Sequence, residues 1–281
     1  MIPGDIATHK VHKFVGKCIY CGSTENLHDE HCIPESLNGV RLLDKGSCRN
    51  CGNITSAFEG RYARESMLAA RTALNMKSKR SKKKRPTEFP MRLIKDGQER
   101  VINVPVSDHI SLIPMLEVGP PRYCPHPPHK KGLQPGQYEL FPFKVKEDEE
   151  IDQLLIKYNA DSISVDCNLE IIGFLRIIAK IAYCTVIWKY GLHNIGKAYV
   201  VPAILGQGEI CDWVGSHGDQ RMYEESKHMN TDHIVTTWQT EDGELHAGVK
   251  LFKKSHTPEY HVVVGRLTEG VQGLYQSIGY K

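Results

Sequence analysis

Two Cys-x-x-Cys pairs, separated by 26 residues, constrain this chain more than any other feature of its sequence. Cys18 and Cys21 form the first pair, and Cys48 and Cys51 form the second. Four thiolates in two such knuckles match a tetrahedral zinc ion with every coordination position filled. The other five cysteines are scattered, which favours a reducing compartment over a disulfide framework. We therefore predict one structural Zn²⁺ bound by these four cysteines.

The segment enclosed by the two pairs predicts a compact local fold. The stretch LHDEHCIPESLNGVRLLD is expected to form two short strands joined by a loop through Pro34 and Gly39, with a helix after the second pair. Residues 56–76 carry apolar side chains at near-helical spacing. Ser56 and Glu59 match the Ser-x-x-Glu capping box, which predicts that this helix starts at Ser56.

Three stretches in this region, CIYCG, DEHCIPESLNG and SCRNC, together resemble the HNH endonuclease family, and most closely its four-cysteine, zinc-bearing members. The resemblance implies a ββα-metal fold that grips a nucleic-acid backbone and hydrolyses a phosphodiester bond with one divalent cation. By this resemblance His31 is the general base and Glu30 is the ligand of a catalytic Mg²⁺ or Mn²⁺.

The residue types suit these roles. A neutral imidazole takes up a proton near pH 7, and a carboxylate is a hard oxygen ligand for Mg²⁺ or Mn²⁺. Neighbouring residues on a strand point to opposite faces, so Glu30 and His31 need a local distortion or separate roles to act on one phosphate.

The sequence departs from the family pattern at three positions. Gly52 stands where the family has an Asn or His ligand, and Asn53 is our candidate for that catalytic position, with Asn50 as the alternative. A turn or capping role is an equally good reading of Asn53. Cys32 stands at a normally aliphatic position and is interpreted as a small core residue. The candidates for the middle asparagine of the family are Asn38 and Asp44.

Charge is unevenly distributed along the chain. Residues 1–90 carry 16 Lys and Arg against 9 Asp and Glu, although the whole chain has a net charge of only +3. The run KSKRSKKKR follows the predicted helix and is a candidate nucleic-acid-binding segment, because such residues neutralise phosphates without reading sequence. A solvated linker is the alternative and is compatible with this role. The basic residues of the run are Lys77, Lys79, Arg80, Lys82, Lys83, Lys84 and Arg85.

The rest of the chain predicts two further parts. Nine of the fifteen prolines lie between Pro105 and Pro142, which predicts a connector over residues 86–150. Residues 151–281 are expected to form a separate α+β domain. It begins with an apolar helix over residues 169–188, in which Arg176 and Lys180 argue for burial in protein over a membrane span. It ends in three alternating strand segments, with a hairpin turn at Asp242-Gly243.

A second metal site is suggested by the stretch from Cys124 to His129, which also contains His126, but its spacing is irregular. Four further histidines lie on or beside the predicted C-terminal strands, where alternation favours strand-face roles over metal ligation. They are His233, His246, His256 and His261.

Together these features predict an α+β protein with an N-terminal zinc-stabilised HNH nuclease domain over residues 1–85. We expect a cytoplasmic, metal-dependent endonuclease that nicks or cuts DNA, in a setting such as restriction or anti-phage defence. The C-terminal domain would recognise a signal or a partner protein, and no membrane is involved. The alternatives are a non-catalytic zinc module that binds nucleic acid and a nuclease directed at RNA.

Overall fold

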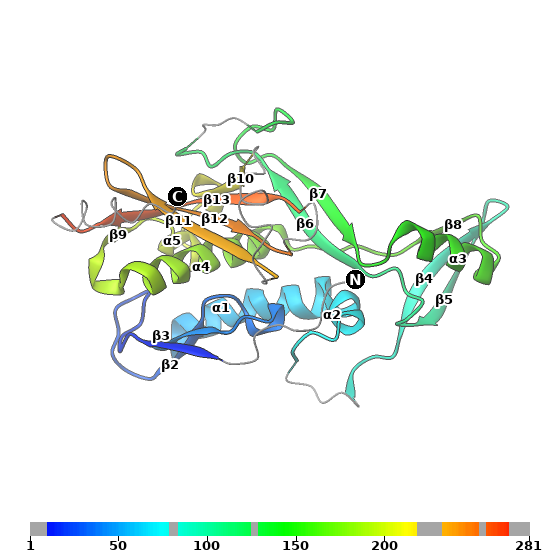
Figure 1. Cartoon of the computed structure of the whole chain (residues 1–281), viewed down its shortest axis with the longest axis horizontal. Coiled ribbons are helices and arrows are strands. Elements are labelled where there is room, and N and C mark those ends of the chain that lie inside the picture. Colours follow the sequence, from blue (N-terminus) through cyan, green and yellow to red (C-terminus); the bar gives the residue numbers. More distant parts are fainter. Residues whose placement is uncertain (1–9, 79–83, 125–128, 218–231, 253–256, 270–281) are drawn as a thin grey trace.

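The apolar helix α4 (Ile171–Tyr190) lies at the centre of the protein (Figure 1). The computed structural model describes residues 10–78, 84–124, 129–217, 232–252 and 257–269. One side of α4 packs on an antiparallel sheet, the main sheet, and the other side packs on helix α1 (Arg49–Arg61). A small N-terminal sheet lies on the far side of α1, so the main body has alternating sheet and helix layers.

The main sheet has the strand order β10-β13-β12-β11, and β9 pairs with the end of β13. Its five strands run antiparallel to their neighbours. The hairpin expected at Asp242-Gly243 is confirmed, because β11 and β12 pair on either side of this turn. The bounds are β9 (Ile195–Ala198), β10 (Val214–His217), β11 (Ile234–Gln239), β12 (Glu244–Lys250) and β13 (Glu259–Leu267).

Helix α4 is buried because it is covered on both sides. It is long and apolar enough to cross a membrane, yet its most apolar 18-residue window is 78% buried inside the protein. Gly173 allows α1 to approach closely, since a Cβ there would lie 3.2 Å from the Cβ of Phe58. Beside this contact, the rings of Tyr62 and Phe174 lie 5.3 Å apart. The expected burial in protein is confirmed and fits a soluble protein, whereas a cytoplasmic location stays a prediction.

The N-terminal unit has the expected order of strand, loop, strand and helix. Strand β2 (Leu27–His31) pairs antiparallel with β3 (Arg41–Cys48), and α1 follows β3 directly. The loop between the strands contains the short helix η1 (Glu35–Leu37). Strand β1 (Val11–Phe14) pairs parallel with the other edge of β3.

The helix start predicted at Ser56 is wrong. Helix α1 begins seven residues earlier, at Arg49. The backbone N–H of Arg49 donates to the carbonyl of Asn26 at 3.1 Å. Ser56 lies inside the helix, where its hydroxyl donates to the carbonyl of Asn53. The second cysteine pair supplies the turn that begins the helix, and Asn26 supplies the hydrogen-bond acceptor, so no capping box is needed. The helical path continues through a π-helical turn, Tyr62–Ser66, to α2 (Leu68–Ala73).

A smaller lobe projects from the main body (Figure 1). It contains the sheet β5-β4-β8 and helix α3, around its own small core that includes Met91, Leu93 and Leu154. The lobe runs across the boundary predicted at residue 150, since β8 pairs with β4. The three-part division stays a prediction. The bounds are β4 (Glu88–Lys95), β5 (Gln98–Pro105), α3 (Asp148–Tyr158) and β8 (Ser162–Ser164).

The hairpin of β6 (Leu112–Val118) and β7 (Tyr138–Lys144) connects the lobe to the main sheet. The hydroxyl of Tyr260 on β13 donates to the carbonyl of Leu116 at 2.7 Å and accepts from its N–H at 3.3 Å. The chain after β6 also presses on β10, because a Cβ at Gly215 would lie 2.3 Å from the carbonyl oxygen of Gly119. Only glycine fits at this crossing. The proline-rich loop between β6 and β7, residues 119–137, is therefore anchored at its start. Short segments complete the described fold: η4 (Leu192–Asn194), α5 (Val201–Ile204) and η5 (Ile210–Asp212).

Candidate functional site

The four predicted zinc ligands come together at one end of the N-terminal unit. The sulfur atoms of Cys18, Cys21, Cys48 and Cys51 all lie within 4.8 Å of one another. Those of Cys21 and Cys48 are 3.6 Å apart. Tetrahedral zinc with sulfur ligands at 2.3 Å requires a separation of about 3.8 Å, so the cluster is close enough to bind zinc with little movement.

Local structure explains how the cysteines meet. The first pair lies in a tight turn, in which the N–H of Gly22 donates to the carbonyl of Cys18 at 2.9 Å. The turn is attached to the sheet by the N–H of Ile19, which donates to the carbonyl of Gly46. The second pair lies at the junction of β3 and α1, and Cys51 is buried in the first turn of the helix. Zinc would therefore connect a turn, a strand end and a helix start.

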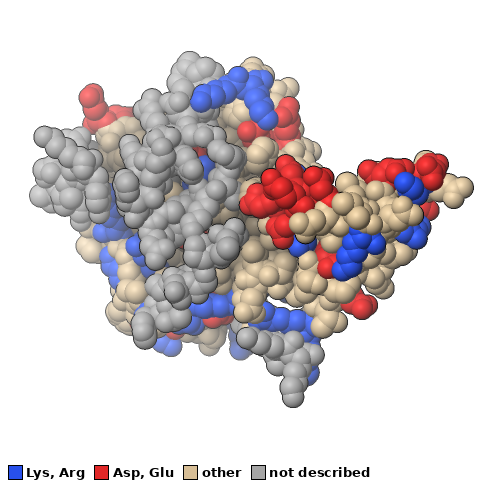
Figure 2. Space-filling view, turned by 45° about the vertical axis from the view of Figure 1, so that its right-hand side comes forward, with Lys and Arg blue, Asp and Glu red and all other residues tan. Residues whose placement is uncertain are grey.

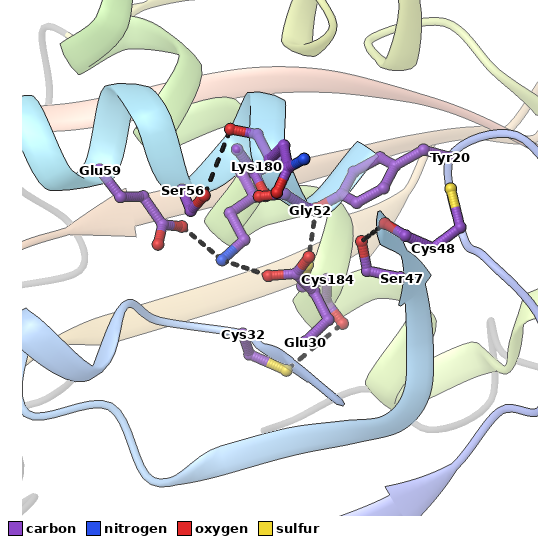
Figure 3. Close-up of polar contacts among 12 residues, drawn as sticks. Tyr20, Glu30, Cys32, Ser47, Cys48, Gly52, Ser56, Glu59, Lys180 and Cys184 are labelled. Carbon is purple, nitrogen blue, oxygen red and sulfur yellow. Dashed lines mark hydrogen bonds and ion pairs between the residues drawn. The ribbon is translucent and has the colours of Figure 1, made fainter. Parts of the chain in front are cut away.

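Glu30 lies on β2 and points into the protein, where it is only 6% exposed. Its carboxylate forms an ion pair of 2.7 Å with Lys180, whose side chain is fully buried in the middle of α4. The same ammonium group lies 2.5 Å from the carboxylate of Glu59 on α1. Figure 3 shows Lys180 between the two carboxylates. One buried cation thus joins three elements that are distant in sequence.

The charges of Glu30, Glu59 and Lys180 influence one another. Burial raises the pKa of Glu59, and the Lys180 ammonium opposes that rise. The two carboxylates raise the pKa of Lys180 above its usual range despite its burial, so Lys180 is charged at neutral pH. Lys180 thus provides the positive charge that compensates the burial of two carboxyl groups.

His31 follows Glu30 on β2 and is partly exposed. Its Nε2 is buried and has no hydrogen-bond partner among the described residues. Burial lowers the pKa of His31, and the nearby charge of Lys180 lowers it further. The ring is therefore neutral at pH 7 and able to accept a proton. A bulge lies between His28 and Glu30, so it does not turn Glu30 and His31 to the same face.

The candidates for the remaining family positions are exposed, lack a side chain or contact other residues. Asn53 and Asn50 are exposed on α1, and Gly52 has no side chain to offer, although a Cβ there would lie 3.3 Å from the hydroxyl of Ser47. Asn38 accepts from the N–H of Lys77, and Asp44 pairs with His12. The role predicted for Asn53 stays a prediction. Cys32 is 1% exposed, which confirms it as a core residue.

The other predicted site residues are placed only in part. Lys77 is half-buried, Lys84 is exposed and Arg85 donates to the side-chain oxygen of Asn75. His129 is buried and accepts from the N–H of Lys131. Five residues of these two predicted sites lie outside the described residues: Lys79, Arg80, Lys82, Lys83 and His126.

Sequence reasoning missed Lys180 and Glu59 as members of this site. Their signal was present, because a lysine in the middle of an apolar helix needs a buried anionic partner once the helix is buried. The identity of that partner was not readable, since Glu59 lies 121 residues away in the sequence. Comparisons with protein-family models, with curated proteins and with solved structures found no significant match to this chain.

We predict that replacing Cys48 by Ala removes one zinc per chain and destabilises the N-terminal unit. The reason is that metal binding at a four-cysteine site contributes folding free energy directly. Zinc content by atomic emission and the melting temperature test this, with Cys167→Ser, a partly buried cysteine outside the cluster, as the control. A Cys48→Ala protein with unchanged zinc content and melting temperature would contradict the assignment.

We also predict that Lys180→Met lowers stability by about 3–5 kcal/mol, because Glu30 and Glu59 then remain buried without a countercharge. Burial already raises the pKa of Glu59, and loss of the Lys180 ammonium raises it further, so the folded variant binds more protons than the unfolded chain and the loss shrinks as the pH falls. Urea unfolding between pH 8 and pH 5 measures this change. The triple variant Lys180→Met, Glu30→Gln, Glu59→Gln is the control and should recover most of the stability. A loss that is independent of pH argues against the shared ion pair.

Proposed function

We propose that the protein is an endonuclease of the HNH type that hydrolyses phosphodiester bonds of DNA. The observation that carries the proposal is His31, a neutral imidazole with a buried, unpartnered Nε2, on the first strand of a β2-β3-α1 unit closed by four cysteines. The motif that includes it resembles the HNH family in the order and spacing of its residues.

In the proposed reaction, His31 takes a proton from the attacking water as that water adds to phosphorus. The 3′ or 5′ oxygen then leaves with its bonding electrons and is protonated by solvent. Burial keeps His31 unprotonated at pH 7, which suits a general base. Glu30 contributes from the interior, where its ion pair with Lys180 fixes the strand that carries His31.

A catalytic Mg²⁺ or Mn²⁺ is part of the family's chemistry, but the described residues do not fit one as they stand. The carboxylate of Glu30 is already paired with the buried Lys180, and position 52 has no side chain. A divalent cation at Glu30 would meet the ammonium group at close range. We therefore assign no catalytic step to a divalent cation.

The same observations favour a second candidate, a zinc module that binds nucleic acid without cutting it. In that case the ion pair of Glu30 stands in place of a metal site and stabilises the fold, while His31 is a structural residue of the strand. The two candidates share the substrate and differ in whether the phosphodiester is broken.

Charge supports the N-terminal unit as the nucleic-acid surface. The basic run lies directly after the helical path from α1, within the part of the chain that carries the excess of Lys and Arg. The opposite sign gathers elsewhere: Figure 2 shows acidic side chains grouped near α3, whose first turn contains Asp148, Glu149 and Glu150. A polyanion would be repelled from that lobe. Restriction or defence, and a partner of the C-terminal part, remain proposals on the resemblance alone.

We predict that His31→Ala slows the nicking of supercoiled plasmid about 10²–10⁴-fold, with folding and DNA affinity preserved, because the proton acceptor is lost. Because burial lowers the pKa of His31 below that of an exposed histidine, about 6.5, wild-type activity should fall only at a pH lower than this value. The control is His28→Ala, an exposed histidine on the same strand.

The assay is run with Mg²⁺, with Mn²⁺ and with EDTA, on plasmid and on single-stranded RNA, with zinc content measured in each case. Equal cleavage by wild type and His31→Ala would refute the assignment of the base. Absence of any cleavage by the wild type would favour the non-catalytic zinc module, and cleavage of RNA alone would favour the RNA-directed nuclease.

We predict that replacing Lys82, Lys83, Lys84 and Arg85 together by Ala weakens DNA binding on every sequence. The slope of log affinity against log salt concentration should also become shallower, by up to about 0.9 per lost phosphate contact. Fluorescence anisotropy between 50 and 200 mM salt measures both effects, since a protein that makes about 6–10 phosphate contacts loses about 10³–10⁵ in affinity over this window. The charge-matched control replaces four lysines that lie outside the basic run: Lys130, Lys131, Lys144 and Lys157. Equal losses in both variants would show that only net charge matters.

A further inference from the structure

Three side chains that are distant in sequence meet at the inner strands β12 and β13 of the main sheet. Cys124 follows β6, His246 lies on β12, and His261 lies on β13. Their ligand atoms all lie within 4.8 Å of one another. The cluster is separate from the four-cysteine site, since it uses none of that site's elements.

The sheet brings the two histidines together. Strands β12 and β13 are antiparallel neighbours, and the register between them shifts at Leu245 and His246. The shift lets two rings that are not directly opposite converge, so that Nδ1 of His246 lies 2.7 Å from Nε2 of His261. Their residues are only 3% and 5% exposed. A nitrogen of each ring is therefore directed at the other ring, in a contact that is largely closed to water.

The chain after β6 positions Cys124. The N–H groups of Arg122 and Tyr123 donate to the carbonyls of Cys211 and Asp212, each at 3.1 Å. The ring of Tyr123 stacks on Trp213, with centroids 4.6 Å apart. Together with the close crossing at Gly215, these contacts fix the backbone up to Cys124 against the sheet. The backbone that carries the Cys124 thiol is thus held in place.

The surroundings of His246 match those of a metal-bound histidine. Its second nitrogen, Nε2, is buried without a hydrogen-bond partner among the described residues. The nearest anion is the carboxylate of Glu244, 3.6 Å from this nitrogen. Metal-bound histidines usually direct the other ring N–H at a carboxylate, which fixes the ring and raises its basicity. Trp238 lies against both rings, at centroid distances of 5.7 Å and 5.3 Å, and shields one side.

We propose that Cys124, His246 and His261 bind a second Zn²⁺. One thiolate and two imidazoles are borderline-soft ligands of the kind that zinc prefers. Tetrahedral zinc with nitrogens at 2.0–2.1 Å separates them by about 3.3 Å, so the two rings need to move apart by only about half an ångström. On binding, the thiol proton passes to solvent, and the proton between the two rings moves to the other nitrogen of its own ring, so both imidazoles stay neutral.

Three protein ligands leave the fourth position of this zinc for water or an added ligand, unlike the closed four-cysteine site. The ion would also connect the proline-rich loop to the C-terminal strands. The expectation that His246 and His261 are only strand-face residues is therefore revised by their geometry. Cys124, suggested from sequence with His126 and His129, takes its partners from the distant strands instead.

The test is the zinc content of the full-length protein after dialysis against micromolar Zn²⁺ and then metal-free buffer. Cys124→Ser and His261→Gln should each hold one zinc per chain fewer than the wild type. Cys211→Ser, which changes a partly buried cysteine outside the cluster, should hold the same amount as the wild type. Equal zinc content in wild type and Cys124→Ser would overturn the proposal.

X-ray absorption at the zinc edge of the wild-type protein provides a measurement that does not depend on the variants folding. We expect nitrogen ligands at about 2.0–2.1 Å beside sulfur ligands at about 2.3 Å. A four-cysteine site alone gives sulfur only. A spectrum with sulfur as the sole ligand type would therefore also overturn the second site.

Discussion

A single buried ammonium group holds the layers of this protein in register. Lys180 is fully buried in α4, and its charge is acceptable there only because Glu30 on β2 and Glu59 on α1 both reach it. Removing an ion from water costs several kcal/mol, so such a group is tolerated only when its partners are well placed. The position of the N-terminal unit on α4 is therefore fixed by charge as well as by apolar packing.

The four cysteines and the ion pair hold different elements of the same small unit together. The cysteine cluster joins the turn after β1 to the start of α1, and Lys180 joins β2 and α1 to the central helix. Between them lies β2, the strand that carries His31. Apolar contacts such as that of Tyr62 with Phe174 fill the space along α1. A short strand is thereby held rigidly enough to fix the position of the partly buried His31 ring.

Local patterns in the sequence predicted much of this fold. The spacing of Cys18 to Cys51 located the cysteine cluster, and alternation around Asp242-Gly243 located the hairpin. The start of α1 was misplaced because the local capping signal at Ser56 was outweighed by the knuckle, which begins the helix at Arg49. Propensity and caps are weak forces, and a tertiary constraint overrides them easily.

Contacts between distant segments were not predictable in the same way. A lysine in an apolar helix indicates an anionic partner, but nothing in the sequence distinguishes Glu59 from other acids. Likewise, the convergence of Cys124 with two histidines depends on a register shift between β12 and β13 and on the crossing at Gly215. Such features follow from the packing of whole layers, so they appear only when the three-dimensional arrangement is known.

The sequence separation in the Lys180 group has a consequence for synthesis on the ribosome. All four cysteines of the first cluster lie within the first 51 residues, whereas Lys180 follows Glu59 by 121 residues. At about 5–20 residues per second, that interval is about 6–24 s. Zinc can close the nascent N-terminal unit during this time, while the carboxylates of Glu30 and Glu59 remain hydrated. The order of translation thus separates metal loading from the burial of charge.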